Sequence, residues 1–204
     1  ASLGQVLFLA VPAWALLSVL CVPVIRLMFE RGSFGPTATV ETTWALLFYL
    51  PGIPAFACAK IFSSPFHAQQ DTRTPVRIAL ACLGLNVVLN LSLMPFLRQG
   101  GLALATTLCS YLNVVLLAVA LRRKIGGLGL RAMGPGLARI AVATLGAFLA
   151  GWQVSNWMSA TPDLGSELMA VVLPLVAAGI VYLGIAVALK SPELASIVPR
   201  RSAR

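Results

Sequence analysis

Six long apolar runs follow one another along this 204-residue chain. Each run reaches the roughly 20 residues that an α-helix needs to cross the hydrocarbon core of a bilayer. None shows the strict two-residue alternation of a membrane β-strand. The sequence therefore predicts an all-α, polytopic membrane protein with six transmembrane helices. The runs cover residues 3–29, 43–65, 76–97, 101–121, 137–158 and 167–189.

The composition excludes an ordinary soluble domain. Hydrophobic residues make up 59% of the chain and charged residues 10%, whereas a soluble domain carries about 25% charged residues. Too little polar surface is available to cover a soluble core. The chain begins without Met at the foot of an apolar run and shows no cleavable signal pattern. We therefore expect a piece of a longer protein.

The basic residues predict the orientation of the chain in the membrane. Of the 15 Lys and Arg residues, 11 lie in the loops at 66–77 and 122–139 and in the tail from 190. The positive-inside rule places these segments in the cytoplasm, and the loop with Asp163 and Glu167 outside. The net charge of +9 then reflects topology and an affinity for anionic lipid. No nucleic-acid partner is expected, because the chain lacks basic residues interleaved with exposed aromatic residues.

The sequence carries no pattern of covalent catalysis. His67 is the only histidine, the four cysteines stand apart without a CxxC motif, and no zinc spacing or nucleophile motif is present. We therefore predict that the protein is not an enzyme and has no catalytic metal.

Ionisable residues inside or at the ends of the apolar runs are the candidates for function. Lys60 lies toward the cytoplasmic end of the second run, where its amine either extends to the lipid headgroups or faces a cavity for an anionic substrate. Arg26 and Glu30 are one helical turn apart at the outer end of the first run and can form an ion pair. Both interpretations of Lys60 are left open by the sequence.

The cytoplasmic turn between the second and third runs has a defined chemistry. Asp71 can accept hydrogen bonds as an N-cap or in an Asx turn, and Pro75 suits the first turn of a new helix. The turn motif consists of Asp71, Thr72, Arg73, Thr74 and Pro75.

Polar residues also occur in the middle of the third and fourth runs. The turn RQGG is short, so the two helices must be antiparallel neighbours. Counting from that turn places Asn90 level with Thr106, and Asn86 level with Ser110. These side chains would form hydrogen bonds between the helices or a cation site made of oxygen ligands.

Four stretches together resemble a known family. They are LMFERGSF at 27–34, Lys60 with PFHAQQDTRTPVRIA at 65–79, the helix with Asn90, and GGLALATTL at 100–108. In this order and spacing they resemble the C-terminal part of the bacterial MurJ/MviN lipid II flippases. That family belongs to the multidrug/oligosaccharidyl-lipid/polysaccharide exporter superfamily.

The resemblance implies a transporter of roughly 14 helices, with two six-helix lobes around a cavity and two extra C-terminal helices. Residues 1–125 would be the last four helices of the second lobe. Residues 126–190 would be the two extra helices, which form a groove for the lipid tail, and 191–204 a basic cytoplasmic tail. Small residues in the extra helices would allow either close packing or a lipid-sized furrow.

The implied function is translocation of lipid II, a lipid-linked peptidoglycan precursor, from the inner to the outer face of the bacterial cytoplasmic membrane by alternating access. Lys60 would lie in the substrate cavity. Some family members resemble a sodium site at the positions of Asn86, Asn90, Leu102 (through its carbonyl) and Thr106, although Asn90 stands where such a member has a carboxylate. The driving force would be a sodium ion or the membrane potential.

Two alternatives remain open at this level. The chain could belong to a polysaccharide-lipid or drug exporter of the same superfamily, or to a non-transporting scaffold that recruits cell-wall synthesis proteins. Beyond lipid II, the expected partners are membrane lipids.

Cysteine-accessibility labelling of the full-length parent protein, with its native cysteines replaced, tests the orientation. A cysteine at position 163 should react with an impermeant reagent added outside, and cysteines at positions 73 and 124 only with reagent that reaches the cytoplasm. The reverse pattern would overturn the topology.

Overall fold

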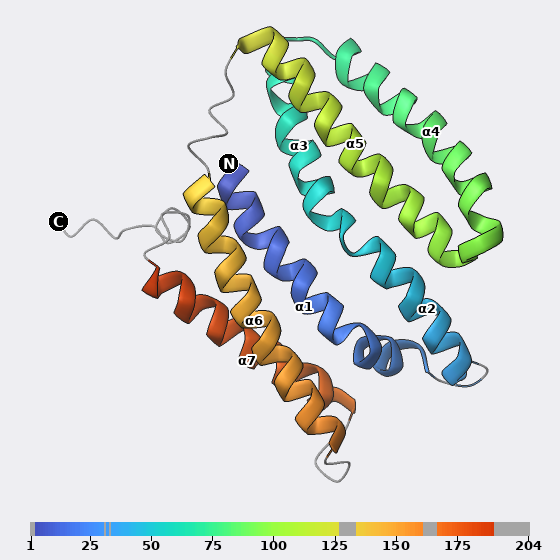
Figure 1. Ribbon diagram of the computed structural model, residues 1–204, viewed down its shortest axis with the longest axis vertical. Helices are drawn as coiled ribbons and strands as arrows, with labels where there is room; N and C mark the ends of the chain where they lie inside the picture. Colours follow the sequence, from blue (N-terminus) through green and yellow to red (C-terminus); the bar gives the residue numbers. More distant parts are fainter. Residues whose placement is uncertain (1–2, 31, 33, 127–133, 161–166, 190–204) are drawn as a thin grey trace. The chain divides into compact units, whose positions relative to one another are not determined.

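The computed structural model describes residues 3–30, 32, 34–126, 134–160 and 167–189. The described residues form helices and turns (Figure 1). The loop around Asp163, the tail 191–204, Arg31 and Arg131 lie outside the described residues. The helices are α1 (Leu3–Phe29), α2 (Pro36–Tyr49), α3 (Gly52–Ala68), α4 (Arg73–Leu97), α5 (Gln99–Ile125), α6 (Gly134–Ala160) and α7 (Glu167–Ala188).

The prediction of six membrane spans in an all-α fold is confirmed. Helices α1, α4, α5, α6 and α7 are each long and apolar enough to cross a bilayer, and α2 and α3 together make one further segment of 33 residues. The chain is therefore a multi-pass membrane protein. Its described parts group into two compact units, which are residues 1–24 with 130–204, and residues 25–129. The predicted division at residue 125 into lobe and extra helices stays a prediction.

The first unit joins the beginning of α1 to α6 and α7. The rings of Phe8 and Tyr182 lie 5.1 Å apart between their centroids, and the Tyr182 hydroxyl donates a hydrogen bond of 2.6 Å to the Phe8 carbonyl. This bond satisfies the one polar atom of the Tyr182 ring inside an apolar core. The cluster consists of Phe8, Ile140, Ala143, Ala147, Ala178, Tyr182 and Ala186.

Small residues bring α6 and α7 close together. Ala147 and Ala178 are 0% exposed, and a Cβ placed on Gly146 would collide with the Cδ1 atom of Ile185. By contrast, a Cβ on Gly179 or Gly184 would meet nothing within 4 Å. The small residues of α6 at this contact therefore serve close helix packing, as in other membrane helix pairs.

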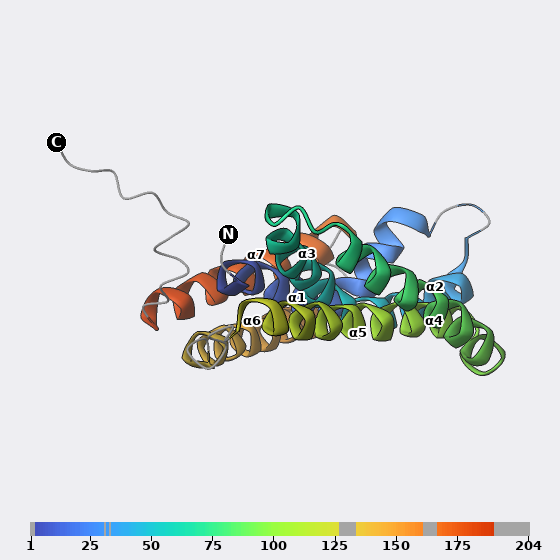
Figure 2. The same cartoon turned by 90° about the horizontal axis from the view of Figure 1, so that it is seen from above.

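The second unit is arranged around α5, which packs against α2, α3 and α4. In Figure 1 and Figure 2, α5 runs beside α4 on one side and beside the α2–α3 segment on the other. Glycines at the start of α5 allow this contact, because a Cβ on Gly101 would lie 2.7 Å from the Leu93 carbonyl oxygen. Arg98 alone makes the turn between α4 and α5, with a φ of 49°.

The second span differs from the single run expected at 43–65. It begins earlier, because Pro36 suits the first turn of a helix, and it is interrupted between Tyr49 and Gly52. Pro51 and Pro54 have no backbone N–H to donate to the carbonyls of residues 47 and 50. The two prolines therefore divide the span into α2 and α3.

Side chains of α5 stabilise this break. The Thr107 hydroxyl donates a 2.7 Å hydrogen bond to the Phe48 carbonyl, and the Tyr111 hydroxyl donates a 2.9 Å bond to the Pro51 carbonyl. Gly52 lets the helices approach, because a Cβ there would lie 3.1 Å from Thr107 Oγ1. Within a bilayer no water is available to replace these donors. The break in one helix is thus compensated by its neighbour.

The substitution Thr107→Val tests this compensation, because it keeps the shape of the side chain and removes the hydroxyl. We expect the full-length parent to lose about 1 kcal/mol of unfolding free energy, measured by titration with a denaturing detergent. Thr106→Val is the matched control in sodium-free buffer, since the Thr106 hydroxyl bonds only the Leu102 carbonyl of its own helix. Equal losses in the two variants would contradict the proposed role of Thr107.

Candidate functional site

The turn between α3 and α4 is built by backbone hydrogen bonds that end α3. The Asp71 N–H donates to the Phe66 carbonyl at 2.9 Å, and the Gln70 N–H donates to the His67 carbonyl at 3.0 Å. These two bonds form a Schellman motif, in which Gln70 takes the left-handed position with a φ of 56°. The motif directs the chain from α3 into α4 within four residues, from Gln69 to Thr72.

Asp71 accepts hydrogen bonds from Thr74, at the start of α4, and from Lys124, at the end of α5. Its Oδ1 accepts the Thr74 N–H at 3.1 Å, and its Oδ2 accepts the Thr74 hydroxyl at 2.8 Å. Lys124, at the end of α5, places its Nζ 2.6 Å from the same Oδ2. Asp71 therefore caps the start of α4 and also ties α4 to the end of α5. The Lys124 contact joins residues 53 positions apart, which the local turn motif did not indicate.

These donors favour the ionised form of Asp71. The hydrogen bond from Lys124, followed by those from the Thr74 side chain and backbone, lowers the pKa of Asp71 from 3.8 to about 2.

Thr72 and Arg73 are exposed, and Pro75 lies in the first turn of α4 as its backbone geometry allows.

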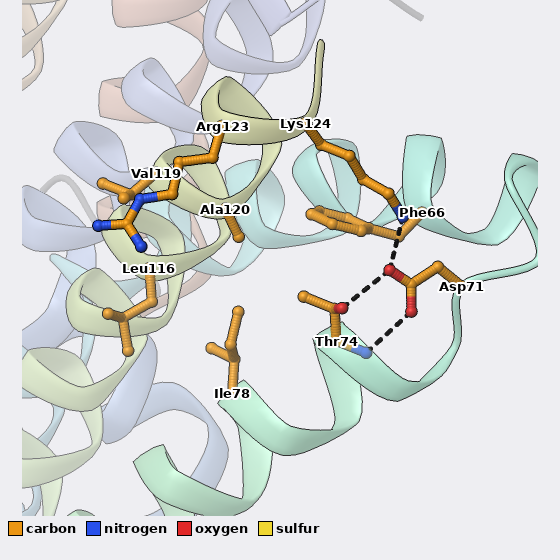
Figure 3. A pocket seen from close by; sticks show the side chains of 9 residues that line it. All are labelled: Phe66, Asp71, Thr74, Ile78, Leu116, Val119, Ala120, Arg123 and Lys124. Atoms are coloured by element: carbon orange, nitrogen blue, oxygen red, sulfur yellow. Dashed lines mark hydrogen bonds and ion pairs between the residues drawn. The ribbon is translucent and has the colours of Figure 1, made fainter. Parts of the chain in front are cut away.

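A pocket of about 530 Å³ lies beside this ion pair (Figure 3). The Asp71–Lys124 pair and Thr74 line one side, and the guanidinium of Arg123 lies on the other side beside apolar side chains of α5. The Lys124 amine also lies 5.6 Å from the centre of the Phe66 ring, close enough for a cation–π contact. The lining residues are Phe66, Asp71, Thr74, Ile78, Leu116, Val119, Ala120, Arg123 and Lys124.

At the opposite end of the second unit, Glu30 connects α1 with α2. Its Oε2 lies 3.6 Å from the Arg26 Nε and accepts a 3.0 Å hydrogen bond from the Thr39 hydroxyl. The Arg26–Glu30 pair has the geometry expected from its one-turn spacing. The role of Thr39, which is buried, was not indicated by the sequence pattern.

The residues of the candidate cation site form two pairs, each within its own helix. On α4, the Asn90 amide donates to the Asn86 Oδ1 at 2.9 Å. On α5, the Thr106 hydroxyl donates to the Leu102 carbonyl at 2.9 Å. In the part of the chain that the structure describes, no hydrogen bond joins the two pairs. Leu102 and Thr106 instead line a pocket with residues of α1 and α2.

One atom of this group is notable for its lack of a partner. The Asn90 Oδ1 is buried and accepts no hydrogen bond among the described residues, although buried polar atoms are nearly always paired. On α5, the Asn113 Oδ1 is also buried and accepts no hydrogen bond among the described residues. Asn113 follows Ser110 by three positions and so extends the polar face of α5. Asn113 was not among the residues predicted from the sequence, although its spacing from Thr106 and Ser110 places it on the same helix face.

Lys60 is exposed on α3 and makes no ion pair with the carboxylates that the structure describes. Its backbone carbonyl accepts a 3.0 Å hydrogen bond from the Ser63 hydroxyl. Within the described residues, no group of three or more His, Cys, Asp or Glu residues could hold a metal ion.

Comparison with known proteins places this arrangement in a family. The sequence profile described as lipid II flippase MurJ matches residues 2–173. The chain is 43% identical over 115 residues to a probable lipid II flippase MurJ of Rhizobium meliloti (strain 1021), covering 56% of this chain and 22% of the relative. It is 30% identical over 155 residues to the lipid II flippase MurJ of Burkholderia cenocepacia, covering 76% of this chain and 29% of the relative.

A solved structure shares the fold. The chain matches a structure titled lipid II flippase MurJ, inward closed conformation, with a TM-score of 0.75 and 22% identity, covering 92% of this chain and 38% of that one. The chain thus spans between about a fifth and two fifths of the length of these proteins.

The pKa of Asp71 predicts a pH dependence of stability. Because folding lowers this pKa from 3.8 to about 2, the Asp71 contribution is complete above the ordinary pKa and is lost as the pH falls toward 2. Asp71→Asn should therefore lower the melting temperature of the full-length parent at about pH 6, and the deficit should shrink as the pH falls below about 4.

Glu41→Gln is the control for this measurement, because Glu41 is exposed and makes no ion pair in the described part of the chain. It should leave the melting temperature nearly unchanged across the same range. A deficit of Asp71→Asn that stays constant down to about pH 2 would refute the role of the ionised carboxylate.

Proposed function

Because this chain belongs to the lipid II flippase MurJ family, we propose that it is part of a transporter that moves lipid II across the bacterial cytoplasmic membrane. The observation that carries the proposal is the family match over residues 2–173. The fold shared with the solved flippase supports it. The substrate would pass from the inner to the outer face, and no covalent step is required.

Transport by alternating access needs helices that move together as rigid groups. Contacts at both ends of the second unit supply this rigidity. Asp71 joins the turn before α4 to Lys124 at the end of α5, and Glu30 joins the end of α1 to Thr39 of α2. Between these ends, α5 bonds the break in the second span through Thr107 and Tyr111. Helices α2 to α5 would therefore move as one body.

Lys60 is the residue that we assign to the substrate. Lipid II carries a pyrophosphate, and an ammonium group is a suitable partner for it. Lys60 is exposed and unpaired among the described carboxylates, so its charge is available to an incoming anion. An ionisable residue within a membrane span is costly to bury and is therefore a candidate for a functional role.

A sodium ion fits the pairs on α4 and α5 only in part. Asn90 offers a buried Oδ1 without a partner, and Asn86, Thr106 and the Leu102 carbonyl offer further neutral oxygens, the kind of atom that hard cations prefer. No carboxylate is present in this set to balance the charge of the ion. The set would thus bind sodium weakly, and the membrane potential would supply the remaining drive.

The two helices α6 and α7 would form the groove for the lipid tail. Their contact is closely packed at Ala143, Ala147 and Ala178, so the tail would lie on an outer face of the pair. Gly179 and Gly184, where a Cβ would meet nothing within 4 Å, mark open positions on α7.

Substitution of Lys60 in the full-length parent tests the proposal. Lys60→Ala should remove a charge-assisted contact worth roughly 1.5–3 kcal/mol and impair transport. Lys60→Arg should retain part of the activity, because the positive charge survives although its geometry differs. The measurement is growth of a strain that depends on the introduced copy, with the amount of protein in the membrane determined in parallel.

Ser64→Ala is the control, since Ser64 is also exposed on α3 one turn further on. It should support normal growth. Normal growth of Lys60→Ala at normal abundance would show that the amine only extends to the headgroups, and would remove Lys60 from the substrate path.

A further inference from the structure

We propose that the pocket beside the Asp71–Lys124 ion pair binds the phosphodiester of an anionic membrane phospholipid, of the phosphatidylglycerol class, from the cytoplasmic leaflet. In this site Arg123 receives the phosphate and the apolar wall of α4 and α5 receives an acyl chain. The site is separate from the transport path assigned to Lys60, and its test does not depend on transport.

The charges around the pocket leave one cation available. Lys124 is neutralised by Asp71 at 2.6 Å. Arg123 is exposed and has no hydrogen bond or ion pair in the described part of the chain. In Figure 3 its guanidinium lies beside Val119, across the pocket from the Asp71 carboxylate. A guanidinium without a partner is well suited to bind a phosphate through two parallel hydrogen bonds.

The pocket also combines charged and apolar side chains, as a phospholipid combines a charged headgroup with apolar chains. Its charged residues lie in the turn before α4 and in the last turn of α5, which the distribution of basic residues places at the cytoplasmic surface. Ile78 and Leu116 lie further into the spans and form its apolar end. A free phosphate would leave this apolar wall exposed, whereas a phospholipid would cover it.

The hydrogen bonds of Asp71 explain the preference for an anionic headgroup. Lys124 already pairs with the Asp71 carboxylate at 2.6 Å, so the lining has no unpaired negative charge to attract the cationic group of a zwitterionic lipid. With Asp71, Arg123 and Lys124 together, the lining carries one net positive charge. Because the Asp71–Lys124 pair carries no net charge, the phosphate binds on the side of Arg123.

Photo-crosslinking identifies the occupant at this one site. The full-length parent carries a photo-crosslinking residue at position 78 and is reconstituted in vesicles of equal amounts of phosphatidylglycerol and phosphatidylcholine. After irradiation, mass spectrometry of the peptide adduct reports the headgroup. We expect phosphatidylglycerol adducts to predominate, and Arg123→Gln to lower this preference roughly tenfold.

Arg122→Gln is the matched control, because it removes the same charge from the neighbouring position, which does not line the pocket. It should leave the preference unchanged. A second variant, Leu116→Trp, fills the apolar end and should abolish both adducts. Normal monodisperse elution of each variant during size-exclusion chromatography is required, and the Arg122→Gln result separates a loss of general surface charge from a loss of the site.

Four results would overturn the proposal. Equal yields of the two lipids would mean that position 78 only contacts the bilayer. Loss of adducts on addition of soluble glycerol phosphate would identify a site for free phosphate. Adducts of lipid II, when it is included in the vesicles, would place the pocket in the transport path. Equal effects of Arg122→Gln and Arg123→Gln would reduce the preference to general electrostatic attraction.

Discussion

The hydrogen bonds between α5 and the broken second span are the interaction on which the second unit depends. A bilayer offers no water to backbone carbonyls, so a helix broken by proline must find donors in a neighbouring helix. Thr107 and Tyr111 donate to the carbonyls of Phe48 and Pro51, and Gly52 allows the approach. These two hydrogen bonds therefore join α5 to the break in the second span.

The ends of the helices are joined by a different kind of contact. At one end Asp71 binds Lys124, and at the other Glu30 binds Arg26 and Thr39. Such pairs contribute little individually where water is present. Their value is positional, because Lys124 ties the end of α5 to the turn before α4, and Thr39 ties α2 to Glu30 at the end of α1. The hydrogen bonds at the break and the ion pairs at the helix ends thus restrain the same helices in the middle and at both ends.

The sequence predicted the spans because apolar length is a strong signal, whereas contacts between spans depend on helix rotation, which length does not determine. The acceptor role of Asp71 was readable because its donor Thr74 is local. Its partner Lys124 was not, since they are 53 positions apart. Asn90 and Thr106 were expected to meet from their equal depth, but equal depth does not fix the facing sides, and their hydrogen bonds stay within α4 and α5.

Acidic residues are too few in this chain to pair with all of its basic residues. The whole chain has six Asp and Glu residues against 15 Lys and Arg residues, so most cations cannot be paired internally. In the described part, the carboxylates of Glu30 and Asp71 are taken by cations at helix ends. A basic side chain without such a partner attracts anions from its surroundings. Its depth in the membrane determines which anions can reach it. Lys60, within a span, would meet only an anion that enters the protein, whereas Arg123, at the last turn of α5, meets the phosphates of the leaflet. Neighbouring positions 123 and 124 therefore differ in the charge they leave unpaired, because only Lys124 has a carboxylate within reach.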